Sequence, residues 1–317
     1  MLVGMSVEDI FDYTNIDPWF LDQLQELIDH EKLILAATRN GVTGIDEHLM
    51  RVTKQFGFSD RQIAASCPDG TTEWDVRSRR KSLGIIPAFK RVDTCAAEYP
   101  SQTPYLYSTY SGIEDEVDDS ATTDSKTTPA PGGNGKRVIV LGGGPNRIGQ
   151  GIEFDYCCVH AALALRELGY ETVMVNSNPE TVSTDFDTSD MLFFEPLTHE
   201  DVMNVIDRLE PHGVIVQFGG QTPLNLARGL KDHGAPLVGT SVESIETAED
   251  RDLFSKLITS LDINQPPNGL ASTPDQALAA AAKIGYPVLV RPSFVLGGRA
   301  MEIVYDAVAL ANYLERN

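Results

Sequence analysis

The sequence predicts a mixed α/β protein with a mostly helical N-terminal region, a central domain built on a parallel sheet, and a shorter α+β region. Three observations lead to this prediction. Apolar residues recur at helical spacing near the N-terminus, β-branched runs alternate with helical patterns farther along, and an acidic, Pro- and Gly-rich stretch separates the two. The expected boundaries are 1–110, 111–135, 136–245 and 246–317.

Helical patterns dominate residues 1–110. Asp17-Pro18 opens a segment in which Pro occupies an early helical position, where its missing N–H does no harm. The apolar residues of this segment are Trp19, Phe20, Leu24, Leu27 and Ile28. A second, short helix is expected to begin near Ser59, because Ser59-Asp60 is a typical N-terminal cap.

Residues 111–135 are expected to form a mobile connector. They contain six acidic residues against one lysine, followed by Thr, Pro, Gly and Asn. A segment with so few apolar side chains buries too little surface to offset the entropy lost on ordering.

Composition excludes several classes of function. The net charge of −21 disfavours nucleic acid as a partner, because phosphate binding needs basic patches. No apolar stretch reaches the roughly 18 residues of a membrane helix, and residues 1–12 lack the basic start of a signal peptide, so the expected location is the cytoplasm. The cysteines and histidines show no metal-ligand spacing, so no metal site is predicted within the chain.

The central domain is predicted from its alternation of strands and helices. The expected strands are residues 137–141, 172–175, 191–194, 213–216 and 236–238. Helices are expected after the first strand, ending at Gly169, and over 198–209. Because the strands show no polar alternation, they should form a parallel sheet covered on both faces.

The α+β region begins near Glu249. Its predicted helices are residues 248–261 and 274–284, and its predicted strands are 288–291 and 301–305.

A glycine-rich run, GGGPNRIGQG at residues 142–151, joins the first central strand to its helix. Backbone amides at such a turn can approach an anion, and the helix N-terminus favours negative charge. A dinucleotide site fits poorly, because Arg147 stands where a third glycine is needed and the second strand ends in Asn176 rather than in an acid. A tight turn without a ligand stays open as an alternative.

Two further loops follow strands of the same sheet: NPET at residues 178–181 and QFGGQTP at 217–223. The carboxyl ends of parallel strands lie along one edge, so these loops and the glycine run should converge on a ligand crevice. Each loop alone is also compatible with an ordinary turn.

The fourth motif is RPSFVLGGR at residues 291–299. A Gly-Gly tip between two strands can donate amides to phosphates, and Arg291 at the strand end can pair with a phosphate oxygen. An ordinary hairpin is the alternative. Glu153, just inside the helix after the glycine run, is either a partner of the helix dipole or part of the polar lining of a substrate path.

Together these segments resemble the large subunit of carbamoyl-phosphate synthetase. The resemblance is carried by residues 140–156, 178–185, 217–223 and 291–299, and upstream by the segments 90–98 and 107–110, which resemble the end of that family's helical oligomerisation domain. It covers nearly the whole chain, and the acidic connector is the main departure. It implies an oligomerisation domain, a Rossmann-like pre-ATP-grasp domain and the first part of an ATP-grasp domain.

The resemblance also implies a function. The family makes carbamoyl phosphate from bicarbonate, glutamine-derived ammonia and two ATP for arginine and pyrimidine biosynthesis, and this segment belongs to the half that phosphorylates carbamate. By analogy Arg291, Gly297, Gly298 and Arg251 bind ATP. The residues expected to line the carbamate tunnel are Gly151, Glu153 and Glu180.

The cofactors so implied are ATP with Mg²⁺ or Mn²⁺, whose ligands are expected beyond this chain. The implied partners are a small glutaminase subunit and the remainder of the large subunit in an oligomer, and the isolated chain is expected to be inactive. No catalytic residue is assigned. Two alternatives stay open: another ATP-grasp ligase such as a biotin carboxylase, which should lack the leader with residues 92–98, and a non-catalytic assembly module.

Overall fold

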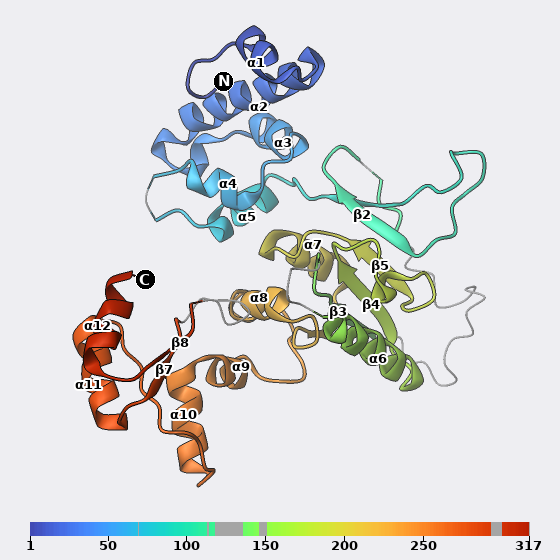
Figure 1. Ribbon diagram of the computed structural model, residues 1–317. Coiled ribbons are helices and arrows are strands. Elements are labelled where there is room, and N and C mark those ends of the chain that lie inside the picture. The colour runs from blue at the N-terminus through green and yellow to red at the C-terminus, as the bar shows by residue number, and fades with distance from the viewer. Residues whose placement is uncertain (69, 113, 118–135, 146–150, 293–299, 317) are drawn as a thin grey trace. The chain divides into compact units, whose positions relative to one another are not determined.

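The structure is a computed structural model that describes residues 1–317 except 69, 113, 118–135, 146–150, 293–299 and 317 (Figure 1). The described residues divide into two compact units. The first combines the helical N-terminal region with the central sheet and extends to Val238. The second consists of residues 239–317 together with the short stretch 151–152. The four boundaries expected from the sequence stay predictions.

The N-terminal region contains five α-helices among its described residues. They are α1 (Val7–Thr14), α2 (Pro18–Ala37), α3 (Glu47–Gln55), α4 (Asp60–Ala65) and α5 (Glu73–Ser82), with 3-10 turns at Thr38–Asn40 and Val42–Gly44. Both predicted helix starts are confirmed, because Asp17 caps α2 and Ser59 caps α4 through a reciprocal bond with Gln62. The core of these helices consists of Ile34, Ile45, Met50, Ile63, Ala64, Val76 and Ile85.

The same region also contains two strands that the sequence did not reveal, β1 (Ala88–Arg91) and β2 (Tyr105–Thr109). They pair antiparallel with each other, and β2 then pairs parallel with β5 (Met191–Phe194). The end of the helical region therefore supplies the edge of the central sheet.

The central sheet has the strand order β1-β2-β5-β4-β3-β6, and all pairs except β1–β2 are parallel. The remaining strands are β3 (Arg137–Leu141), β4 (Glu171–Asn176) and β6 (Gly213–Ile215). The four predicted strands and their parallel pairing are confirmed. The expected fifth strand at 236–238 is wrong, because this segment makes only an isolated bridge between Leu237 and Val214.

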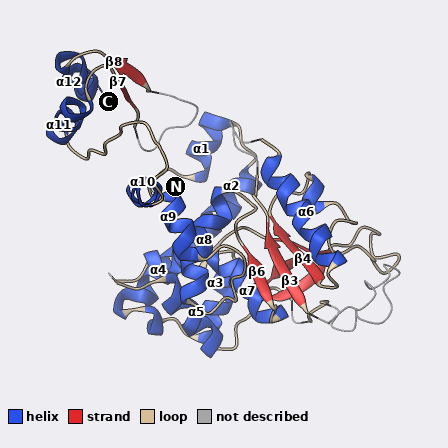
Figure 2. Cartoon of the chain, turned by 90° about the horizontal axis from the view of Figure 1, so that it is seen from below, coloured by secondary structure: helices blue, strands red, loops and turns tan. Residues whose placement is uncertain are grey.

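Helices cover both faces of this sheet, as predicted. The helix α6 (Glu153–Glu167) lies on one face, while α7 (His199–Leu209) and α8 (Gln221–Asp232) lie on the other (Figure 2). The strand β3 is buried from Val138 to Leu141, which explains its continuous apolar run.

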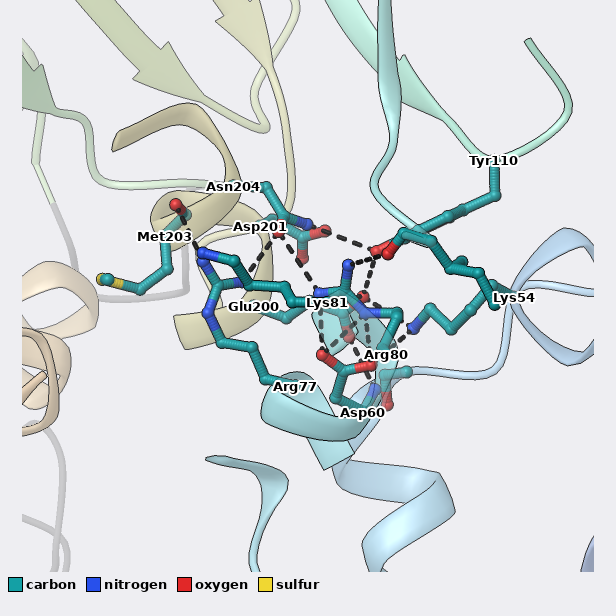
Figure 3. A network of polar contacts seen from close by, with 12 residues as sticks. Lys54, Asp60, Arg77, Arg80, Lys81, Tyr110, Glu200, Asp201, Met203 and Asn204 are labelled. Carbon is teal, nitrogen blue, oxygen red and sulfur yellow. Dashed lines mark hydrogen bonds and ion pairs between the residues drawn. The ribbon is translucent and has the colours of Figure 1, made fainter. Parts of the chain in front are cut away.

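A buried charge network, here called the seam network, joins the helical region to α7 (Figure 3). It consists of Lys54, Asp60, Arg80, Tyr110 and Glu200. The guanidinium of Arg80 donates to Asp60 from Nε and Nη2 at 3.1 and 2.9 Å, and Nζ of Lys54 lies 2.6 Å from Oε1 of Glu200. The hydroxyl of Tyr110 donates to the same Glu200 oxygen at 2.8 Å. Two cations therefore match two carboxylates in a site closed to solvent.

The helix α5 makes further contacts beside this network. Arg77 donates to Oδ1 of Asn204 at 2.7 Å and contacts Asp207, both on α7. Trp74 stacks on His233 at the end of α8, with ring centroids 3.4 Å apart. These contacts explain why the helical region and the sheet form one compact unit.

The start of the acidic connector is anchored rather than free. The amide of Glu116 donates to the carbonyl of Phe89 at 2.8 Å, and its carboxylate accepts from the amide of Arg91 at 2.9 Å. Asp115 accepts from Arg208 on α7 at 2.8 Å. Glu116 therefore occupies backbone groups that the edge strand β1 would otherwise expose. Residues 115–117 therefore contact β1 and α7, 118–135 lie outside the described residues, and the expected mobility of the connector stays a prediction.

The second unit contains α9 (Val242–Glu249), α10 (Arg251–Ser260), α11 (Pro274–Ile284), the antiparallel pair β7 (Val288–Val290) and β8 (Glu302–Val304), and α12 (Ala307–Arg316). Its core residues are Ala281, Val304, Leu310 and Tyr313. The prediction of one helix over 248–261 is wrong. Asp250 is extended and caps α10 by accepting the amides of Asp252 and Leu253, so the chain forms two helices there.

Within the described part of the chain, no helix combines the length and the apolar character that crossing a bilayer requires.

Candidate functional site

The three predicted loops of the central sheet do meet at its carboxyl edge. The glycine turn that follows β3 is fixed against the end of β4: the amide of Gly142 donates to the carbonyl of Val175 at 2.8 Å, and the amide of Gly144 donates to Oδ1 of Asn176 at 3.0 Å. Gly144 adopts φ 71°, which favours glycine. The turn is therefore held in place by bonds to the last two residues of β4.

Asn176 organises this edge. It is 1% exposed, and besides Gly144 its Oδ1 accepts the amide of Asn178 at 3.2 Å, while its Nδ2 donates to Ser183 at 3.2 Å. From the sequence alone, Asn176 was only an argument against a dinucleotide site. Its burial and its bonds show that an amide is needed there as both donor and acceptor, which a carboxylate cannot be.

The third loop packs directly on the glycine turn. A Cβ atom on Gly219 would lie 2.5 Å from the carbonyl oxygens of both Gly142 and Leu141. A Cβ atom on Gly142 would lie 2.5 Å from Nδ2 of Asn176. Both distances are too short for a side chain, so Gly219 allows the backbones of the two loops to touch, and Gly142 leaves room for the side chain of Asn176.

Two of the three predicted tunnel residues lie beside this edge. Glu153 is the exposed first residue of α6, and Glu180 is an exposed residue of the loop after β4 whose amide donates to Asn178 at 3.0 Å. The two segments are tied together, because Asp155 in the first turn of α6 accepts the amide of Ser183 at 3.1 Å. Gly151 is described as part of the second unit. The tunnel role of all three stays a prediction.

The predicted nucleotide-binding residues belong to the second unit. Arg251 is the first residue of α10, Arg291 directly follows β7, and both side chains are exposed. Gly297 and Gly298 lie outside the described residues. The structure thus leaves both guanidinium groups accessible to a ligand and leaves their nucleotide role a prediction.

Three family models match successive parts of the chain. Residues 1–84 match the carbamoyl-phosphate synthetase large chain oligomerisation domain, residues 134–247 the carbamoyl phosphate synthase preATP-grasp domain, and residues 250–317 the carbamoyl-phosphate synthase L chain ATP binding domain. The chain belongs to the carbamoyl phosphate synthase large-chain family. This membership confirms the resemblance seen in the motifs and decides against the biotin carboxylase alternative.

Curated members of the carbamoyl phosphate synthase family are similar along nearly the whole chain. The large chain of Rhodopirellula baltica is 58% identical over 311 residues, covering 98% of this chain and 27% of that protein. The large chain of Archaeoglobus fulgidus is 54% identical over 312 residues, covering 98% and 28%. The arginine-specific chloroplastic large chain of Arabidopsis thaliana is 53% identical over 328 residues, covering 99% and 26%. The chain thus spans about a quarter of the length of these relatives.

Among solved structures, the biotin carboxylase domain of Hydrogenobacter thermophilus 2-oxoglutarate carboxylase, crystallised with MgADP, ADP and bicarbonate, is 22% identical with a TM-score of 0.43. The match covers 57% of this chain and 40% of that one. Biotin carboxylase from Campylobacter jejuni is 16% identical with a TM-score of 0.42, covering 57% and 41%. Likenesses at these scores support no conclusion about function.

This carbamoyl phosphate synthase family member also carries two acids with raised pKa values at the same sheet edge, the buried Glu195 and the partly exposed Asp201, that the sequence did not single out. Glu195 directly follows β5 and is 4% exposed. Burial, with added repulsion from Asp201 and Glu200, raises the pKa of Glu195 to about 8. Burial also raises the pKa of Asp201 to about 6, against the opposing hydrogen bond from Thr198. The only sequence signal was an acid placed directly after an apolar strand.

The described residues of this family member contain no cluster of three or more His, Cys, Asp and Glu suited to a metal ion.

Proposed function

We propose that this chain forms part of the carbamate-phosphorylating half of a glutamine-hydrolysing carbamoyl-phosphate synthase. The observation that carries the proposal is the order of the matched domains: an oligomerisation domain comes first, a preATP-grasp domain follows, and an ATP-binding domain comes last. In the arrangement that the motifs imply, the second synthetase half is the one that follows the oligomerisation domain.

The proposed reaction transfers the γ-phosphoryl group of the second ATP to carbamate and yields carbamoyl phosphate and ADP. Carbamate itself comes from bicarbonate, glutamine-derived ammonia and the first ATP. The product serves arginine and pyrimidine biosynthesis, and the arginine-specific name of the Arabidopsis relative supports the first of these. Phosphoryl transfer depends mainly on positioning and on neutralising charge.

In this proposal Arg251 and Arg291, with the Gly297-Gly298 turn, hold the phosphates of ATP. A guanidinium group suits this task because its fork of N–H donors matches two phosphate oxygens at once. Mg²⁺ or Mn²⁺ accompanies the nucleotide and neutralises its charge. We assign the metal ligands to the remainder of the large chain.

Gly151, Glu153 and Glu180 are proposed to line the path that brings carbamate to this site. Carbamate is unstable in water, so an enclosed path protects it. The fixed turn at Asn176 supports this role, because it holds the Glu180 loop against the start of α6. The proposed partners are the glutaminase subunit and the rest of the large subunit in a cytoplasmic oligomer.

The nucleotide role can be tested in a chimera in which this segment replaces its counterpart in the Rhodopirellula baltica large chain. We expect Arg291→Ala to lower kcat/KM for making ATP from carbamoyl phosphate and ADP by about tenfold or more, since a charge-assisted phosphate contact is lost. Bicarbonate-dependent ATP hydrolysis, which belongs to the other half, should change less than about twofold.

The matched control is Arg316→Ala, which removes an exposed arginine bonded to Glu302 in the same unit. It should leave both rates unchanged. Equal losses in both reactions for Arg291→Ala, or no loss in either, would argue against the assignment of Arg291.

A further inference from the structure

The parallel pairing that attaches β2 to the sheet is short. Only Tyr105 with Leu192 and Leu106 with Phe193 are in register. Beyond them the carboxyl group of Glu195 takes over, because it accepts both the amide and the hydroxyl of Ser108, the hydroxyl at 2.9 Å. The side chain of Glu195 therefore continues the contact between β2 and β5 where their backbone hydrogen bonds stop. This contact is here called the β2–β5 seam, or simply the seam.

The charges around this seam do not balance. Lys54 and Arg80 are matched by Asp60 and Glu200, with the shortest oxygen contact of each cation at 2.6 and 2.9 Å. Glu195 adds a further buried carboxyl, and the charged groups that act on it, Asp201 and Glu200, are both acidic.

Asp201 lies in the first turn of α7, and its carboxylate accepts from the hydroxyl of Thr198 at 2.6 Å. Asp201 is the second acid that no cation neutralises. Lys54, the cation that acts on it, is already bonded to Asp60 and Glu200. Tyr110 adds no negative charge, because burial and the neighbouring Glu200 raise the pKa of its phenol and keep it neutral. A proton on Glu195 removes one of the two uncompensated negative charges.

We propose that Glu195 is a proton-controlled latch, which clamps β2 onto β5 while its carboxyl is protonated and opens the seam when the proton is lost. In the protonated form one oxygen still accepts the Ser108 amide, and the Ser108 hydroxyl, which donates to Oε2 in the structure, can instead accept from the O–H of the carboxyl group. Loss of the proton leaves a buried carboxylate among acids, which favours an opened seam where water can reach it.

The latch is adjacent to the candidate site. Leu197 follows Glu195 by two residues, and its Cδ1 lies 3.5 Å from the position a Cβ atom would take on Gly144. The loop that carries Glu195 therefore also contacts the glycine turn.

The direction of the pH dependence follows from the raised pKa. The folded form binds the proton more tightly than the unfolded form, so its stabilising effect is complete at low pH and is lost as the pH rises through about 8. For one group, the equilibrium constant for closing the seam should fall about tenfold between pH 7 and pH 9.

Hydrogen exchange on the 317-residue chain tests the latch, with rates corrected for intrinsic base catalysis. The protection factors of the amides at 106–108 should fall about tenfold between pH 7 and pH 9, while those at 138–141 in β3 stay constant. Glu195→Gln, which keeps an acceptor for the amide and has no titrating proton, should abolish the dependence. Glu167→Gln, at an exposed site on α6, should behave like the unaltered chain.

Parallel losses in β2 and β3 in the unaltered chain would overturn the proposal, and this result does not depend on whether any variant folds. A pH dependence in Glu195→Gln equal to that of the unaltered chain would also overturn it.

Discussion

Replacement of Arg80 by methionine is expected to lower the free energy of unfolding of the first unit by about 3–5 kcal/mol. Arg80 is fully buried and donates to both oxygens of Asp60, to the carbonyl of Ile85 at 2.9 Å and to Asn204 at 3.3 Å. Methionine fills part of the space but leaves Asp60 and Glu200 sharing one cation, Lys54. An unpaired buried carboxylate is far less stable than one in water.

Urea unfolding of the two chains at pH 7 measures this effect. The control is Arg51→Met, which removes an arginine whose pair with Glu47 one turn away is exposed to solvent. That change should cost at most about 0.5 kcal/mol. If the two variants lost equal stability, the seam network would not be what holds α4 and α5 on α7.

Replacement of Gly219 by alanine is expected to lower the free energy of unfolding by about 1–3 kcal/mol. The added methyl would lie 2.5 Å from two carbonyl oxygens, and backbone atoms cannot rotate away as a side chain can. The loop after β6 must then separate from the glycine turn, so the amides of Gly142 and Gly144 should lose protection from hydrogen exchange.

The matched control is Gly112→Ala, whose methyl would meet only side chains, the nearest at 3.2 Å. Those side chains can shift, so the loss should be clearly smaller and the glycine turn unaffected. An equal effect of the two changes would mean that the close approach of the two loops does not determine the turn.

Local signals made several features of the fold predictable from the sequence. Asp17 and Ser59 cap their helices with bonds to residues two or three positions away, so their meaning can be read without the fold. The β-branched runs that predict β3 and β4 are local signals of the same kind. Convergence of the loops at one edge followed from the parallel sheet alone.

Other features depend on contacts between residues far apart in the sequence, so local patterns could not predict them. The strand β2 is stabilised by a partner strand more than 80 residues later in the chain, and Glu195 is an ordinary acid until Ser108 and α7 enclose it. The role of Asn176 likewise depends on two loops coming together, the glycine turn and the loop after β4. The break between α9 and α10 was missed although its signal is local: an Asp side chain such as that of Asp250 can cap the first turn of a new helix.

Formation of ATP from carbamoyl phosphate and ADP by the Rhodopirellula baltica chimera tests the central claim most directly. If this segment belongs to the carbamate-phosphorylating half, the chimera should run this reaction within about tenfold of the parent enzyme, and bicarbonate-dependent ATP hydrolysis should be retained. A chimera that folds and hydrolyses ATP with bicarbonate, yet makes no ATP from carbamoyl phosphate, would contradict the claim.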